Sequence, residues 1–71
     1  MAVEVRAPTT GIVIELKAGP GSKVTTDDEL MVIESMKMHI PVTSPSDGVV
    51  DAVHVSEGDQ VSEDDLVLTL S

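Results

Sequence analysis

The sequence contains no cysteine and no aromatic residue, and each absence excludes a class of protein. Without cysteine no disulfide can brace the chain, which excludes a secreted, disulfide-dense miniprotein and fits a reducing cytosol. Without phenylalanine, tyrosine or tryptophan, any core has to be built from small aliphatic side chains. Valine is the commonest residue, at 12 of 71, and its frequency favours a β-rich domain. The lack of cysteine favours a cytoplasmic one.

Positive charge is also scarce. Four lysine and arginine residues stand against 13 aspartates and glutamates, which gives a formal net charge of −9. A chain this acidic is a poor partner for nucleic acid. Its apolar runs are only a few residues long, so no membrane span is expected. We expect one domain over residues 1–71, with little room for an active-site cleft, and the like charges favour a monomer.

The chain repeats itself without a gap at an offset of 37 residues. Identical pairs include Pro8/Pro45, Gly11/Gly48, Val13/Val50, Gly21/Gly58, Val24/Val61, Asp27/Asp64 and Asp28/Asp65. Two halves, about 3–34 and 40–71, would form one core by packing together, because neither can bury its apolar face alone. The repeat predicts an all-β fold with pseudo-twofold symmetry, a flattened β-barrel or sandwich of two antiparallel sheets with about eight short strands.

One strand of each half does not alternate strictly between inward apolar and outward polar side chains. Alternation along the expected strand 12–18 would bury Ile14, but the repeat pairs Ile14 with Asp51 in strand 49–55. A β-bulge after Val13 and Val50 removes this conflict. We therefore expect a bulge in both halves. The side chains that it turns inward are Val13/Val50, Leu16/Val53 and Ala18/Val55.

Turn residues occupy equivalent places in the two halves. Glycine supplies the unusual backbone angles of the first turn of each half, and acidic residues mark the second. The expected turns are 19–22 with 56–59 and 27–29 with 63–65, Val24 and Val61 are the buried anchors between them, and the last strands are 30–34 and 67–70.

The halves are joined by the segment Glu34-Ser35-Met36-Lys37-Met38, which is expected to form a strand, a tight turn and a second strand. Lys37 lies near the tip and is the only lysine or arginine after position 23. On spacing alone, the favoured interpretation is a surface hairpin with a solubilising lysine. Two exposed methionines beside a hairpin tip nevertheless indicate that something docks there.

The same segment resembles the biotin attachment motif of biotin carboxyl carrier domains, commonly Glu-Ala-Met-Lys-Met. In that family the modified lysine lies at the midpoint of two homologous halves, as Lys37 does here. The Gly-x-x-Val and Pro-x-x-Gly elements of the family also match, at Gly21/Val24, Pro45/Gly48 and Gly58/Val61. The resemblance covers essentially the whole chain and is greatest to the free-standing bacterial biotin/lipoyl attachment proteins.

Two departures from the family pattern are visible. Ser35 replaces the common alanine, which is a small-for-small change. The gapless repeat leaves no place for the thumb insertion that some carriers of acetyl-CoA carboxylase possess. An Ala/Pro-rich linker is also missing, and the residues leave open whether the chain is a complete protein or an excised domain, although Met1 favours a native start.

The resemblance implies a cofactor carrier and not an enzyme. A biotin protein ligase would attach biotin to Lys37. Glu34, Ser35, Met36 and Met38 would serve ligase recognition. The biotin would then shuttle a carboxyl group between the biotin carboxylase and carboxyltransferase sites of a biotin-dependent carboxylase.

Two alternatives remain at this stage: a lipoyl carrier domain, whose tip is usually Asp-Lys-Ala, and an unmodified interaction module. No metal site is expected, because His39 and His54 are 15 residues apart without cysteine and the aspartate pairs lack the pattern of a Ca²⁺ loop. Those pairs are expected to serve as turns, and His39 is expected to point outward beside the tip.

Overall fold

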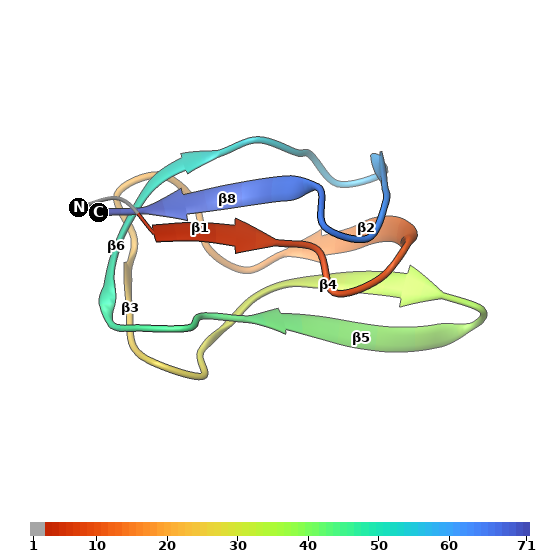
Figure 1. Cartoon of the computed structure of the whole chain (residues 1–71), viewed down its shortest axis with the longest axis horizontal. Coiled ribbons are helices and arrows are strands. Elements are labelled where there is room, and N and C mark those ends of the chain that lie inside the picture. The colour runs from red at the N-terminus through yellow and green to blue at the C-terminus, as the bar shows by residue number, and fades with distance from the viewer. Residues whose placement is uncertain (1–2) are drawn as a thin grey trace.

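The computed structural model describes residues 3–71 and consists of eight strands in two four-stranded antiparallel sheets (Figure 1). The strands are β1 (Val3–Arg6), β2 (Gly11–Leu16), β3 (Lys23–Val24), β4 (Glu29–Ser35), β5 (Met38–Thr43), β6 (Gly48–Val53), β7 (Gln60–Val61) and β8 (Leu66–Leu70). One sheet has the order β1-β8-β6-β3 and the other β5-β4-β2-β7. The prediction of an all-β sandwich with about eight strands is confirmed.

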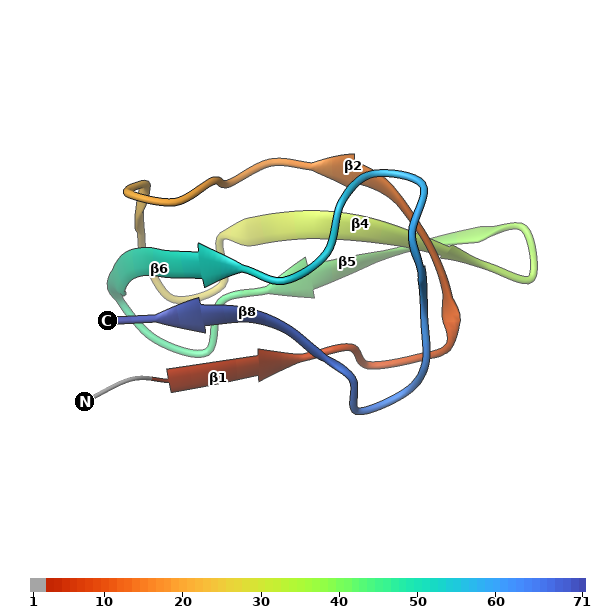
Figure 2. The same ribbon diagram turned by 90° about the horizontal axis from the view of Figure 1, so that it is seen from above.

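The pseudo-twofold repeat exchanges the two sheets. Shifting the chain by 37 residues carries β1 onto β5, β2 onto β6, β3 onto β7 and β4 onto β8. Under this shift the order β1-β8-β6-β3 becomes β5-β4-β2-β7, which is the second sheet. Each sheet therefore draws two strands from each half, and the halves interlock (Figure 2). The sequence repeat predicts a shared core but not this exchange.

The β-bulge occurs in both halves, as predicted. The register of β2 against β4 shifts between Val13 and Glu15, and that of β6 against β8 shifts between Val50 and Ala52. The extra residue is Ile14 in one half and Asp51 in the other, and both are exposed. The preceding valine in each half is completely buried. The bulge therefore reconciles an isoleucine and an aspartate at equivalent positions, because neither side chain enters the core.

The core lies between the sheets and is entirely aliphatic apart from methionine. Its buried members are Val5, Ala7, Val13, Ala18, Val24, Leu30, Met31, Ile33, Val42, Val50, Val61, Val67, Leu68 and Leu70. The two anchors after the glycine turns, Val24 and Val61, are buried as predicted.

The prediction that the side chains of Leu16, Val53 and Val55 point into the core is only partly right. These side chains are half-buried and pack against the edge of the core. The bulged strands also end at Leu16 and Val53, two residues earlier than expected. The reason lies in the hydrogen bonds, since the amides of Lys17 and Ala18 both donate to the carbonyl of Leu30, at 2.9 and 3.2 Å, and the regular ladder stops there.

The equivalent turns use the same devices. Gly21 and Gly58 have φ of 88° and 93°, which is the left-handed conformation that glycine adopts at no steric cost. In the acidic turns the backbone amides of Thr25 and Ser62 donate to the side chains of the aspartates three residues later, at 2.9 and 2.8 Å. The turn role predicted for the aspartate pairs is confirmed, because these side chains close the turns themselves.

Candidate functional site

The candidate site is the hairpin formed by β4 and β5. Register pairs run from Ile33 with Ile40 through Glu34 with His39 to Ser35 with Met38. Exposure rises along this path, since Ile33 is fully buried, Ile40 is half-buried and Met38 is 65% exposed. The hairpin therefore leaves the core at its far end, where it projects beyond the other strands on the side opposite to the chain ends (Figures 1 and 2).

The tip is a two-residue turn made of Met36 and Lys37. Both residues have positive φ, 51° and 65°, which is the pattern of a type I′ turn. This turn type matches the right-handed twist of antiparallel strands, but it favours asparagine and glycine. A residue with a Cβ atom costs about 1–2 kcal/mol in this conformation. The hairpin thus holds the lysine backbone in a strained and well-defined geometry.

The side chains at the tip point into solvent. Met36 is 94% exposed, and Lys37 is exposed as well. Over residues 3–71, no hydrogen bond or ion pair engages the amine of Lys37. Chemically, the arrangement presents a primary amine at the end of a rigid projection, with an apolar thioether on each side.

Two ionisable side chains form the register pair next to Ser35 and Met38, on the side away from the turn. Glu34 and His39 face each other across the hairpin, with 3.5 Å between the Oε2 and Nε2 atoms. Both side chains are about half exposed or more, at 47% and 66%, so the prediction that His39 points outward is confirmed. A contact this open to solvent contributes little to stability.

Relieving the strain at the tip is expected to stabilise the domain. Met36→Asn places a residue that tolerates the left-handed conformation at φ 51°, and we expect the free energy of unfolding to rise by about 1 kcal/mol. Urea denaturation followed by far-ultraviolet circular dichroism measures the change. Met38→Asn is the matched control, because Met38 lies in extended β5 where asparagine is unfavourable. A gain of equal size in both variants would contradict the strain argument.

Other candidate chemistry is not assembled by the fold. Within the described residues, no group of three or more histidine, cysteine, aspartate or glutamate side chains could hold a metal ion. No helix in that part of the chain is long and apolar enough to cross a membrane.

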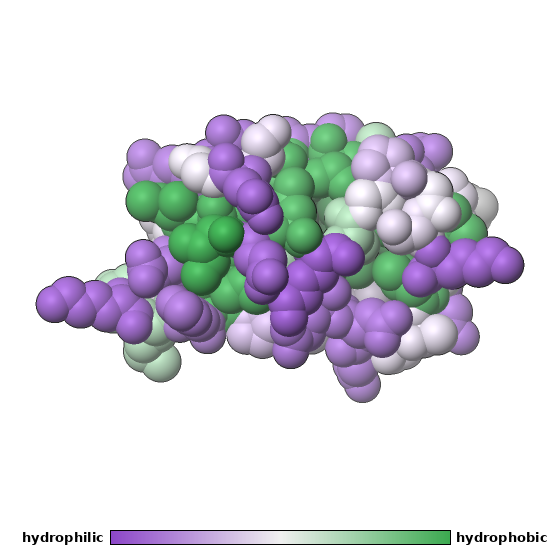
Figure 3. Space-filling view, turned by 180° about the vertical axis from the view of Figure 1, so that it is seen from behind, coloured by the Kyte–Doolittle hydropathy of each residue, from purple (hydrophilic) through white to green (hydrophobic). Residues whose placement is uncertain are grey.

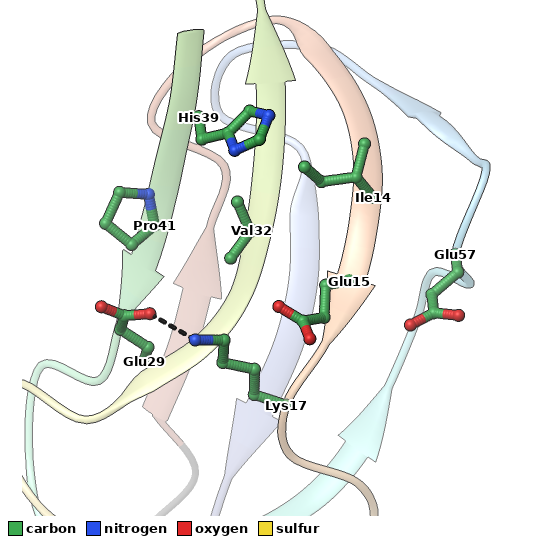
Figure 4. Close-up of a pocket in the computed structure, with 8 residues that line it drawn as sticks. All are labelled: Ile14, Glu15, Lys17, Glu29, Val32, His39, Pro41 and Glu57. Carbon is green, nitrogen blue, oxygen red and sulfur yellow. Dashed lines mark hydrogen bonds and ion pairs between the residues drawn. The ribbon is translucent and has the colours of Figure 1, made fainter.

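A groove beside the hairpin was not predicted from the sequence. It has a volume of about 590 Å³ and lies on the outer face of the sheet that contains the hairpin (Figure 4). Its lining residues are Ile14, Glu15, Lys17, Glu29, Val32, His39, Pro41 and Glu57. The one sequence feature that could have indicated this groove is the pairing of Ile14 with Asp51 in the repeat. We used that pairing only to predict a β-bulge.

The comparisons with known proteins agree with this geometry. The family model described as "Biotin-requiring enzyme" matches residues 3–70. The biotinylated protein TB7.3 homolog of Mycobacterium leprae is 39% identical over 71 residues, which cover all of both chains. Human mitochondrial pyruvate carboxylase is 40% identical over 67 residues, but these make up 94% of this chain and only 6% of that enzyme.

Solved structures show the same fold. Urea carboxylase of Kluyveromyces lactis superposes with a TM-score of 0.94 at 28% identity, over all of this chain and 6% of that protein. The lipoyl domain of the 2-oxoglutarate dehydrogenase complex of Azotobacter vinelandii reaches a TM-score of 0.80 at 28% identity, covering 97% of this chain and 95% of that domain.

The relatives therefore differ in size but share one unit. This chain spans about 6% of the length of the mammalian pyruvate carboxylases that it matches, and all of the mycobacterial biotinylated protein. The matched unit includes the whole repeat and the hairpin that carries Lys37. The chain is a carrier domain and belongs to the biotin/lipoyl attachment family of biotin-requiring proteins.

Proposed function

We propose that the amine of Lys37 is the attachment point of biotin and that this domain carries the cofactor for a biotin-dependent carboxylase. The observation that carries the proposal is the placement of Lys37 at the exposed turn of a projecting hairpin. The residues fit the group, because the Lys37 side chain is exposed and its amine forms no hydrogen bond or ion pair in residues 3–71 that attachment would break.

The other lysines are less suitable. Lys17 donates a hydrogen bond of 2.8 Å to Glu29, and that bond, together with the charge of Glu29, raises the pKa of the Lys17 amine. A raised pKa keeps the amine protonated and lowers its reactivity as a nucleophile. Lys23 lies on the short strand β3, where it pairs with Val49 of β6, and not in a hairpin turn.

Attachment requires a biotin protein ligase. The lone pair of the Lys37 nitrogen attacks the acyl carbon of the biotin adenylate, an amide bond forms, and AMP leaves. The ligase has to accept the proton of the ammonium group, since the tip offers no hydrogen-bonded base. Counted from the ammonium form of Lys37, the products are one amide, one AMP dianion and two protons, and the formal net charge of −9 becomes one unit more negative.

The residues around Lys37 favour biotin over lipoate. The fold itself does not discriminate, because a lipoyl domain superposes with a TM-score of 0.80. The flanking side chains differ from the Asp-Lys-Ala usual in lipoyl domains. Met36 and Met38 offer adaptable apolar surface, at 94% and 65% exposure, which a ligase pocket can bury. Glu34 and Ser35 complete the recognition segment that we propose.

When bound, biotin accepts and delivers a carboxyl group, so the partners that we propose are biotin carboxylase and carboxyltransferase components. The chain's own residues hold the attachment point on a rigid hairpin and dock transiently. Names of relatives, among them pyruvate carboxylase and propionyl-CoA carboxylase, support this assignment. The acidic surface favours a monomer by self-repulsion, and the lack of cysteine favours the cytoplasm.

Intact mass spectrometry tests the proposal directly. The purified protein is incubated with ATP and either a biotin ligase with biotin or a lipoate ligase with lipoate. We expect one biotinyl group per chain in the first reaction and an unchanged mass in the second. Exclusive lipoylation would establish a lipoyl carrier, and an unmodified mass in both reactions would favour a plain interaction module.

A further inference from the structure

The outer faces of the two sheets differ, although the repeat makes their backbones equivalent. On the hairpin sheet the outer face carries Ile14, which is 39% exposed, and the half-buried Val32. The equivalent positions on the other sheet are Asp51 and Thr69. Because that half folds with polar residues at both positions, the fold does not require the apolar pair. The apolar surface therefore calls for an explanation other than stability.

The apolar pair lies in the groove beside the hairpin, which we call the outer groove. Ile14, Val32 and Pro41 come from three adjacent strands of one sheet (Figure 4). From behind, the molecule shows a green apolar area bordered by purple hydrophilic groups (Figure 3). The outer groove thus combines an apolar centre with a polar rim.

The rim is acidic. Lys17 is paired with Glu29 at 2.8 Å, so these two charges offset each other. Glu15 and Glu57 line the same groove, and neither forms an ion pair in the part of the chain that the structure describes. The complementary surface therefore has an apolar centre and a rim of lysine or arginine.

The outer groove is continuous with the proposed attachment site. Its residue His39 is two positions from Lys37, in the same hairpin. A specific protein interface buries about 800 Å² on each partner, roughly a fifth of the 4256 Å² surface of this domain. A two-residue turn cannot supply that area. A protein that binds Lys37 specifically therefore has to cover a flank of the hairpin as well.

We propose that the outer groove is the docking surface for the biotin protein ligase, which presents to it an apolar centre and a cationic rim. The inference rests on the proposed function. The ligase has to select the domain before any cofactor is attached, so its recognition depends on protein surface alone. Carboxylase components can in addition hold the attached cofactor. A second copy of this chain would bring the same acidic rim and be repelled.

The test exchanges the residues of one outer face for those of the other. Ile14→Asp/Val32→Thr copies the side chains that the second half already carries at positions 51 and 69. We expect kcat/KM for biotinylation to fall about tenfold or more, mainly through KM, because the double variant loses the apolar contact and would have to bury an aspartate carboxylate in its place. The reverse exchange, Asp51→Ile/Thr69→Val, is the control and should leave kcat/KM unchanged.

A charge test works even if the double variant fails to fold. Glu15→Lys should lower kcat/KM severalfold at low ionic strength and weaken its dependence on salt. Asp51→Lys changes the net charge equally on the opposite face and should have little effect. Equal losses in both variants would overturn the docking surface, because only net charge would then matter.

The remaining outcomes separate the two proposals. Rapid biotinylation of the wild type together with an unchanged kcat/KM in folded Ile14→Asp/Val32→Thr would overturn the outer groove as the ligase surface and leave Lys37 as the attachment site. Failure of the ligase to modify the wild type would overturn both proposals.

Discussion

Lys37→Arg is expected to abolish biotinylation and to leave the fold and stability of the domain unchanged. Arginine keeps the positive charge and the long side chain, but its guanidinium stays protonated and is no nucleophile at neutral pH. Because Lys37 is exposed and its side chain forms no hydrogen bond or ion pair in residues 3–71, the free energy of unfolding should not change. Streptavidin binding and intact mass after exhaustive ligase treatment measure the effect.

The matched controls are Lys17→Arg and Lys23→Arg, which should be biotinylated as fully as the wild type. Lys17→Arg also keeps a cation beside Glu29, so an arginine–glutamate ion pair can replace the present lysine–glutamate pair, whose length is 2.8 Å. A biotinylated Lys37→Arg protein would refute the assignment, and peptide mapping would then show which amine was used.

The strands and their bulges could be predicted from the sequence where the two halves of the repeat constrain each other. The pairing of Ile14 with Asp51 excluded strict alternation, because an aspartate cannot replace an isoleucine in an aliphatic core. A bulge was the local solution, and the register shifts lie where that argument placed them. Two copies of one sequence pattern thus carried information that neither copy carries alone.

What the sequence could not supply depends on three-dimensional arrangement. Nothing in Met-Lys predicts a type I′ turn, since local preference favours Asn-Gly there; the twist of β4 and β5 imposes it. The exchange of strands between the sheets also cannot be predicted from local patterns. Each strand would have the same pattern of apolar and polar residues in a sandwich without the exchange. The outer groove went unseen because its residues come from separate strands that only the sheet order brings together.

Close approach of backbones explains two of the repeated glycines. A Cβ atom on Gly11 would overlap the carbonyl oxygen of Glu34, and one on Gly48 would lie 2.8 Å from the carbonyl oxygen of Ser71. Glu34 and Ser71 are themselves equivalent under the 37-residue shift. The repeat therefore preserves a contact as well as a turn, and at Gly11 this contact lies at the base of the projecting hairpin.

Leu70→Ala is expected to lower the free energy of unfolding by about 3 kcal/mol, and Leu16→Ala by only about 1 kcal/mol. The chemical change is the same, but the burial differs. Leu70 is completely buried on β8, where it pairs with strands on both sides, whereas Leu16 is half-buried at the end of β2. From the sequence alone both leucines would have been assigned to the core, and only the early end of β2 separates them.

Urea denaturation followed by far-ultraviolet circular dichroism measures both values, because the chain has no aromatic residue to report by fluorescence. A small domain has only about 5 kcal/mol of stability to lose, so Leu70→Val, with a smaller expected loss, is the second variant if Leu70→Ala does not fold. Biotinylation of each folded variant should equal that of the wild type, since neither leucine lies near Lys37. An equal loss of stability from Leu16→Ala and Leu70→Ala would show that the edge of the sandwich is packed as tightly as its centre, and the distinction between half-buried and fully buried side chains would then have no energetic meaning in this domain.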